Sequence, residues 1–324
     1  MDTIQILLAI AAATFAAAVT LGNADAAPMD PSDINTATFS GEQLPEGQSA
    51  LAVRLQVLLD RAGASPGVID GYSGENVEKA IRGFEQVNGI EADGLMDQNV
   101  WDTLQAMGSD VIVPYTITEE DVSGLSAELP EDYAELAKLD HLGFTSVREK
   151  LAERFHMDED LLSDLNPGAQ FVAGETIAVA DPGTDQQAEV ASLIADKSEA
   201  RVLAYDNTQT LIAIYPVTIG SSSTPSPTGT HTVNGVAIDP TYSYDPKNFV
   251  QGNNTEPLTL PPGPNGPVGD VWIDLSEPTY GIHGTADPSR IDKTSSHGCV
   301  RMTNWDAREL AHMVSEGVTV EFRD

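Results

Sequence analysis

The 324-residue sequence contains little cysteine, little positive charge and few aromatic residues. Its single cysteine, Cys299, cannot form a disulfide within the chain, so a small scaffold that depends on disulfides is excluded. The 16 Lys and Arg residues face 50 Asp and Glu residues, and the formal net charge of −34 opposes binding to nucleic acid or anionic lipid. We therefore expect no nucleic-acid partner. The acidic excess lies mainly in residues 1–185, and we interpret it as a solvated surface.

Long apolar runs are absent except near the N-terminus, where residues 4–21 are mostly apolar. The small-x-small triplet at 24–26 follows this run, as signal peptidase requires. We interpret residues 1–26 as a signal peptide and expect the protein in the periplasm or elsewhere in the cell envelope. No Lys or Arg precedes the run, and Asp2 stands where a basic residue is usual. An uncleaved N-terminal anchor is the second interpretation, because the run is just long enough to approach a bilayer span.

The mass of 34.4 kDa, with 41% hydrophobic residues, indicates two or three domains. Residues 27–47 are rich in Pro, Ser, Asp and Gly without apolar periodicity, which predicts a flexible leader. Residues 48–108 carry apolar residues at helical spacing in three segments, separated by Asp-Gly turns at 70–71 and 93–94, which predicts a compact three-helix unit. This unit resembles the type 1 peptidoglycan-binding domain family, on the run "VIDGYSGENVEKAIRGFEQVNGIEADGLMDQNVWDTL". The resemblance implies attachment to the cell wall.

Residues 111–181 open with the strand-like "VIVPYTI" and close with "ETIAVA", and they enclose two segments with helical spacing. The order strand, helix, helix, strand resembles a LysM module, which implies glycan binding. An acidic insertion at 118–143 departs from that pattern, because the first strand of a LysM module runs quickly into its helix. We expect His141 and His156, which lie in this segment, at the surface.

Residues 186–324 change to the two-residue period of strands, as in "VASLIAD", "ARVLAYD" and "TLIAIYPVTIG". Further strands are expected at 230–237, 270–275 and 318–322, and one amphipathic helix at 304–315. The predicted fold class is therefore a multidomain α+β protein. It combines a small three-helix domain, a small LysM-like βααβ module and a mostly-β C-terminal domain.

The one cysteine lies in the segment "SSHGCVRM", and its neighbours carry the groups that acyl transfer needs. A thiol with a pKa of ~8.5 is only slightly ionised at neutral pH, so an imidazole that accepts its proton makes it a better nucleophile. Gly298 permits a tight turn, and the backbone amides of Gly298 and Cys299 could bind a developing oxyanion. Two histidines are candidate bases. His297 lies on the same stretch of chain as the cysteine, whereas His283 can approach the sulfur from a separate strand.

Two other interpretations of this segment follow from the residues alone. Cys299 could be an inert buried thiol. Alternatively, His283, His297 and Cys299 could bind zinc, although a fourth ligand and the usual paired spacing of ligands are lacking. His231 and His312 are expected to have no part in the site.

The C-terminal region is similar to the L,D-transpeptidase (YkuD) family, whose signature is a His followed after a spacer by Ser/Thr-His-Gly-Cys. This chain places His283 before the run "SHGCVR", and "TPSPTGTHTV" and "LPPGPNGPVG" also match the family. The resemblance implies that Cys299 is the nucleophile, that His283 accepts and donates the proton, and that His297 supports the site. It also implies that Arg301 and Ser296 bind substrate, and that neither a metal nor an organic cofactor is needed.

The same resemblance implies an exported transferase of peptidoglycan synthesis, acting in cell-wall biogenesis and cell shape. Cys299 would attack the carbonyl of the third, diamino-acid residue of a tetrapeptide stem and release the terminal D-alanine. An amine of another stem would give a 3→3 crosslink, a protein lysine would be anchored to the wall, and water would make the enzyme an L,D-carboxypeptidase. A non-catalytic peptidoglycan-binding envelope protein and a thiol hydrolase of ordinary peptides are the other interpretations. The sequence indicates no oligomeric state.

Overall fold

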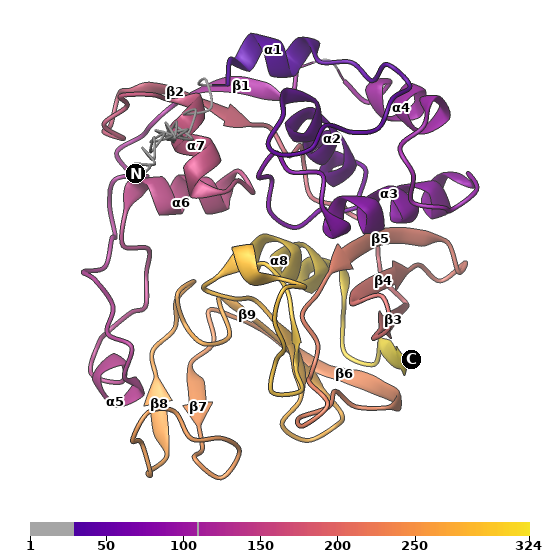
Figure 1. Ribbon diagram of the computed structural model, residues 1–324. Coiled ribbons are helices and arrows are strands. Elements are labelled where there is room, and N and C mark those ends of the chain that lie inside the picture. The colour runs from indigo at the N-terminus through magenta and orange to yellow at the C-terminus, as the bar shows by residue number, and fades with distance from the viewer. Residues whose placement is uncertain (1–28, 109) are drawn as a thin grey trace, which may run out of the picture.

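A computed structural model of the chain describes residues 29–108 and 110–324. The predicted signal peptide at 1–26 lies outside the described residues. Within the described part, no helix is both long and apolar enough to cross a membrane. A helical body lies against a mostly-β domain (Figure 1). The predicted multidomain α+β fold class is confirmed.

The helical body joins the two predicted N-terminal modules around one hydrophobic core. Leu55 and Phe84 from the three-helix unit share this core with Leu151 and Val179 from the LysM-like segment. Apolar residues at helical spacing supply the buried faces, and side chains such as Ser49 cap the helix starts by accepting backbone N–H bonds. The elements of this body are α1 (Pro31–Thr36), α2 (Ala50–Arg61), α3 (Glu75–Asn88), α4 (Gln98–Gln105), α6 (Val147–Arg154), α7 (Glu159–Leu165) and the antiparallel strands β1 (Ile112–Thr116) and β2 (Thr176–Ala180).

The prediction of a flexible leader at 27–47 is wrong for the residues that the structure describes. Asp30 caps α1, and Ile34 and Phe39 are buried in the core of the helical body. Asn35 binds the body through its side-chain oxygen, which accepts hydrogen bonds from two backbone N–H groups at the start of β1. Two isolated apolar residues produce no periodicity in a sequence, although they suffice to dock a short helix.

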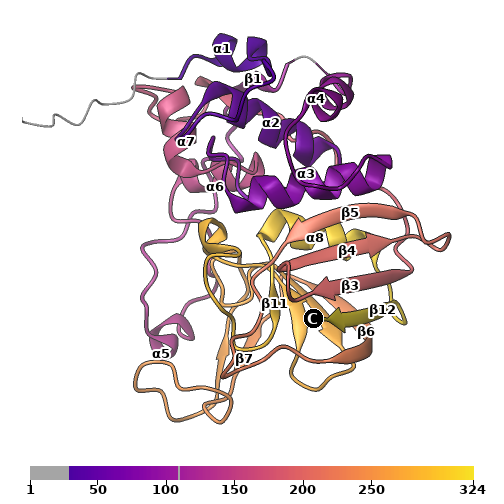
Figure 2. The same ribbon diagram turned by 45° about the vertical axis from the view of Figure 1, so that its right-hand side comes forward.

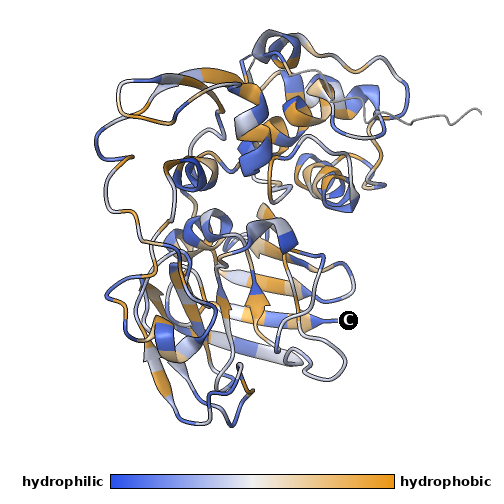
Figure 3. Ribbon diagram, turned by 60° about the vertical axis from the view of Figure 1, so that its left-hand side comes forward, coloured by the Kyte–Doolittle hydropathy of each residue, from blue (hydrophilic) through white to orange (hydrophobic). Residues whose placement is uncertain are grey.

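The C-terminal domain is built on an eight-stranded mixed sheet in the order β11-β10-β9-β6-β12-β3-β4-β5. Figure 3 shows hydrophobic residues along its strands, and their buried side chains form a second core with the apolar face of the last helix. The elements of the sheet and its helix are β3 (Ser192–Asp196), β4 (Arg201–Tyr205), β5 (Leu211–Pro216), β6 (Gly229–Ile238), β9 (Val271–Leu275), β10 (Gly281–His283), β11 (Val300–Arg301), α8 (Asn304–Met313) and β12 (Thr319–Arg323). A separate antiparallel pair, β7 (Tyr242–Tyr244) and β8 (Leu258–Leu260), extends from the sheet, and a 3₁₀ turn spans Pro288–Arg290.

The two bodies contact each other through α3, which lies along the edge strand β5, and through α8 (Figure 2). At this interface the ring of His156 stacks on Trp305, with centroids 5.1 Å apart, and its Nδ1 lies 2.7 Å from Asp60 Oδ2. The expectation that His156 is a surface residue is therefore wrong. Its side chain is 18% exposed, because the second body covers it.

The acidic insertion at 118–143 also reaches the second body. We call it the acidic arm. It extends from the helical body to β7 and β8, and it contains the short helix α5 (Tyr133–Leu136) (Figure 1).

Candidate active site

The register of two short strands places the predicted catalytic residues on one side of the sheet. β10 and β11 run parallel, with Ile282 opposite Val300 and His283 opposite Arg301. Cys299 immediately precedes β11 and is thus beside Gly281. Residues two apart on a strand share a face, and so do register partners. Cys299, Arg301 and His283 therefore point to the same face.

The turn before Cys299 is stabilised by a glycine and by hydrogen bonds to a buried serine. Gly298 has φ of 116°, and a Cβ there would lie 2.6 Å from Tyr280 Cε1, so only glycine fits. Ser296 is 4% exposed, and its hydroxyl donates to the carbonyl of Cys299 at 2.6 Å and accepts from the N–H of Gly298 at 3.0 Å. Ser296 was expected to bind substrate, and Gly298 to bind the oxyanion. In this structure the Ser296 hydroxyl and the Gly298 N–H form a hydrogen bond with each other. This leaves the backbone N–H of Cys299 as the candidate oxyanion donor.

His283 is buried in a form suited to accept a proton. It is 5% exposed, and its Nδ1 lies 2.6 Å from the carbonyl oxygen of Gly284. A carbonyl only accepts hydrogen bonds, so Nδ1 carries the proton and Nε2 keeps its lone pair. Burial, together with the positive charge of Arg301, lowers the pKa of His283 to about 4. The imidazole is therefore neutral at physiological pH, and its ring stacks on Trp272 at 5.7 Å.

Cys299 is half-buried, and its thiol is also neutral at rest. Burial raises its pKa, while the N–H of Gly281 and the charge of Arg301 act in the opposite direction. The sulfur lies 3.8 Å from the carbonyl oxygen of Thr279. The site therefore holds a thiol and a neutral imidazole rather than a thiolate–imidazolium pair. A thiol in this state can act as a nucleophile only if a base takes its proton.

Arg301 and His297 flank the thiol in different ways. Arg301 is half-buried, burial lowers its pKa, and none of the described Asp or Glu residues forms an ion pair with its guanidinium. A guanidinium in this state can bind the carboxylate of a ligand. His297 is exposed and stacks on Phe249, with centroids 4.6 Å apart and planes 18° apart. Its ring contacts Phe249, whereas His283 lies on the face of the sheet to which Cys299 and Arg301 also point.

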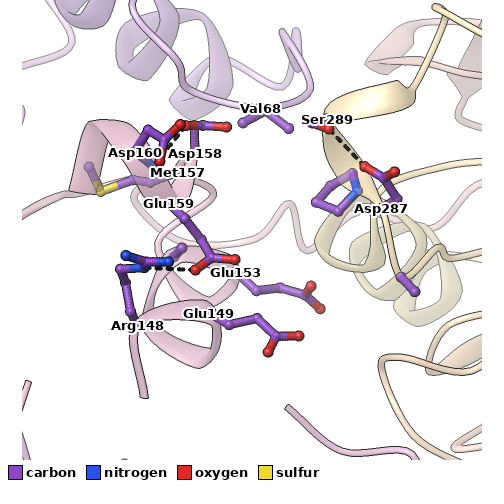
Figure 4. A pocket seen from close by; sticks show the side chains of 13 residues that line it. Val68, Arg148, Glu149, Glu153, Met157, Asp158, Glu159, Asp160, Asp287 and Ser289 are labelled. Carbon is purple, nitrogen blue, oxygen red and sulfur yellow. Dashed lines mark hydrogen bonds and ion pairs between the residues drawn. The ribbon is translucent and has the colours of Figure 1, made fainter. Parts of the chain in front are cut away.

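A cavity lies where the helical body meets the loop between His283 and Cys299. This cavity of about 300 Å³ is strongly acidic (Figure 4). Its lining carboxylates are Glu149, Glu153, Asp158, Glu159, Asp160 and Asp287. Arg148 donates to Glu159, and Ser289 donates to Asp287. No set of three or more His, Cys, Asp or Glu side chains in residues 29–108 and 110–324 is arranged to hold a metal ion.

Sequence reasoning missed several residues that shape the site. Asn304 is 1% exposed and donates to Glu153 Oε1 of the helical body at 2.7 Å, next to the backbone of Gly284. Phe249 covers His297, and the acidic arm packs behind it. None of these residues belongs to a local motif. Only the spatial proximity of distant segments connects them with the site.

Comparisons with known proteins found two matching family models and several related proteins. A family model described as the L,D-transpeptidase catalytic domain matches residues 191–321, and one described as a peptidoglycan binding domain matches residues 48–104. The L,D-transpeptidase YkuD of Bacillus licheniformis is 33% identical over 175 residues, covering 53% of this chain and 90% of that protein. The protein of the same name in Bacillus subtilis is 30% identical over 172 residues, which cover 52% of this chain and 89% of that protein.

Among solved structures, an L,D-transpeptidase from Xylanimonas cellulosilytica aligns over 88% of this chain and 100% of its own, at 14% identity and a TM-score of 0.38. Both family models leave residues 111–181 unmatched, so the LysM-like resemblance of that segment stays a prediction.

Proposed function

This chain belongs to the L,D-transpeptidase family, and from that premise we propose that Cys299 is acylated by the tetrapeptide stems of peptidoglycan. The chain carries an L,D-transpeptidase catalytic domain and a peptidoglycan-binding domain, so peptidoglycan is its substrate and the cell envelope its place of action. The donor stem, the acceptor amine, export by residues 1–26 and a periplasmic location are parts of the proposal.

In the first half-reaction the sulfur of Cys299 attacks the carbonyl carbon of the third residue of the stem. Nε2 of His283 accepts the thiol proton as the C–S bond forms. The backbone N–H of Cys299 stabilises the negative oxygen of the tetrahedral intermediate. The intermediate then expels the amine of the terminal D-alanine, which takes the proton from His283, and a thioester remains.

In the second half-reaction an amine attacks the thioester. His283 accepts the proton of this amine, and the departing sulfur takes it back, so the enzyme returns to its resting form. A side-chain amine of another stem gives a 3→3 crosslink. A protein lysine gives an anchored protein, and water gives an L,D-carboxypeptidase. Arg301 holds the carboxylate of the donor near the sulfur.

One observation supports this assignment most directly. The pairing of β10 with β11 puts a neutral imidazole, a thiol and a guanidinium on the same face of the sheet, and no acidic side chain among residues 29–108 and 110–324 forms an ion pair with that guanidinium. These are a base, a nucleophile and a carboxylate binder, which is the set that acyl transfer from a peptide with a free C-terminus requires.

The test is acylation of the purified protein by disaccharide-tetrapeptide, followed by intact mass spectrometry and by release of D-alanine. We expect a thioester adduct on the wild-type protein and none on Cys299→Ala, with both proteins equally folded by circular dichroism. A Gly235→Ala variant is the matched control, because no atom lies within 4 Å of a Cβ built there. A wild-type protein with a free thiol that forms no adduct and releases no D-alanine would contradict the proposal.

A further inference from the structure

The acidic arm (residues 118–143) is bound to the catalytic domain by its backbone. The N–H of Leu142 donates to the carbonyl of Pro262 at 2.8 Å, and the N–H of Asn265 donates to the carbonyl of Leu142 at 3.0 Å. At Gly263 a Cβ would overlap the carbonyl of Leu142, so these two segments of the chain approach as closely as only glycine allows. The arm is therefore fitted to the loop that follows β8.

Side chains of the catalytic domain bind the arm at a second point, around α5. Gln251 Nε2 donates to the carbonyl of Glu131 at 2.7 Å, and the N–H of Tyr133 donates to Gln251 Oε1 at 3.1 Å. Asn254 Nδ2 lies 3.3 Å from Asp132 Oδ2. These contacts fix the position of Tyr133 relative to the segment between β7 and β8.

Tyr133 is the central ring of an aromatic cluster beside the thiol. Its ring meets those of Tyr244 at 5.3 Å, Tyr242 at 6.3 Å and Phe249 at 6.5 Å, all edge to face. Phe249 in turn stacks on His297, two residues before Cys299. Residues 133 and 297 are thus separated by one ring.

The pKa shifts of two of these tyrosines are consistent with their position near the site. Burial raises the pKa of Tyr133, and the charge of Arg301 opposes that effect. Burial also raises the pKa of Tyr242, with added contributions from Tyr133 and from Cys299. These charge effects agree with the ring contacts, which place Tyr133 and Tyr242 at the same part of the catalytic domain as Arg301 and Cys299.

We propose that Tyr133, contributed by the acidic arm, is a specificity-determining residue of the catalytic site. With Tyr242 and Phe249 it forms an aromatic wall that packs on the alkyl carbons of the donor peptide, while its hydroxyl donates to the carboxylate that Arg301 binds. The ligand class is a peptide with a free C-terminal carboxylate. This inference rests on the proposed function, because the donor must reach Cys299.

The experiment measures kcat and KM for acylation of the full chain by disaccharide-tetrapeptide, with iodoacetamide alkylation of Cys299 in parallel. We expect Tyr133→Ala to raise KM at least tenfold, and Tyr133→Phe, which keeps the ring, to raise it about threefold. Both should leave kcat and the alkylation rate within a factor of two. Leu139→Ala, 37% exposed on the same arm, is the matched control and should change nothing.

A donor with an amidated C-terminus separates the two roles of Tyr133. It lacks the carboxylate, so Tyr133→Phe should no longer differ from wild type. An unchanged KM in Tyr133→Ala, or equal losses in kcat and alkylation rate without a change in KM, would overturn the inference while the proposed function stands. If no donor acylates the wild-type chain, the proposed function is wrong, and this inference is wrong with it.

Discussion

At the scale of the residue, the proposed chemistry depends on the protonation states of His283 and Cys299. Both groups are held in their neutral forms, because burial disfavours the charged imidazolium and the charged thiolate alike. The hydrogen bond from His283 Nδ1 to the Gly284 carbonyl leaves the lone pair on Nε2. The arrangement avoids a permanently charged thiolate, which is the form of cysteine that oxidises most easily.

The pH dependence of kcat/KM should report this environment. His283 accepts a proton only when neutral, so activity is lost as pH falls through its folded-state pKa of about 4 rather than through its ordinary value of 6.5. We expect kcat/KM for acylation to be nearly constant between pH 7 and 5 and to decline below that, measured while circular dichroism shows the fold intact. A decline centred near pH 6.5 in the wild-type protein would be incompatible with a buried neutral His283.

At the scale of the element, α3 of the peptidoglycan-binding domain holds the loop that joins His283 to Cys299. Lys79 Nζ lies 2.6 Å from Asp292 Oδ2, and both side chains are 12% exposed. Asn76, one turn earlier on the same helix, donates to the carbonyl of Ile291 at 3.5 Å. The loop therefore depends on a helix of another domain for its position.

Breaking this ion pair should disturb the loop. Lys79→Met leaves the Asp292 carboxylate half-buried without its partner, so we expect a loss of about 2 kcal/mol in stability and about a tenfold loss in kcat/KM. The double variant Lys79→Met/Asp292→Asn removes the uncompensated charge and should recover most of the stability, as measured by thermal unfolding.

Lys138→Met serves as the control for this pair, because Lys138 and its partner Glu135 are 64% and 56% exposed. We expect it to unfold and react like the wild-type protein. If the double variant were as unstable as Lys79→Met alone, an unpaired carboxylate could not be the cause.

At the scale of the whole molecule, the interface between the two bodies is polar and acidic. Glu153 of α6 accepts a hydrogen bond from Asn304 of α8, and burial raises its pKa to about 7 despite that bond. Asp306, also on α8, is 3% exposed and has a pKa raised well above its ordinary value by burial. Burial thus raises the pKa of both carboxyl groups at this interface, so we expect the contact between the two bodies to depend on pH.

Glu153 should make the folded protein less stable as pH rises. Below its ordinary pKa of 4.5 both the folded and the unfolded chain hold the proton, whereas between 4.5 and about 7 only the folded chain holds it. The stability contributed by this group is therefore lost as pH increases through that window. Glu153→Gln keeps an acceptor for Asn304, and we expect it to be about 2 kcal/mol more stable than wild type at pH 8 and similar at pH 4.5.

Thermal unfolding at both pH values, with the exposed Glu119→Gln as control, tests this prediction. An equal stabilisation at both pH values would indicate a packing effect instead of an ionisation.

The sequence by itself determined the features that depend on local pattern. Alternating apolar residues predicted β3, β4, β5 and the expected strands at 230–237, 270–275 and 318–322, all of which the structure contains. The spacing of His283, His297 and Cys299 led to the family that the comparisons show. Such signals are readable because strand period, glycine turns and motif order are properties of neighbouring residues.

Only the tertiary structure decided the features that depend on distant residues meeting. The burial of His156, the internal bonding of Ser296 and the docking of residues 29–47 all arise where one segment covers another. The contact of Tyr133 with Phe249 is of the same kind, since 116 positions separate them in the sequence (249 − 133). The exposure of a side chain, its hydrogen-bond partners and its pKa depend on which residues the folded chain brings within a few ångströms of it. A local pattern of residues does not contain that information.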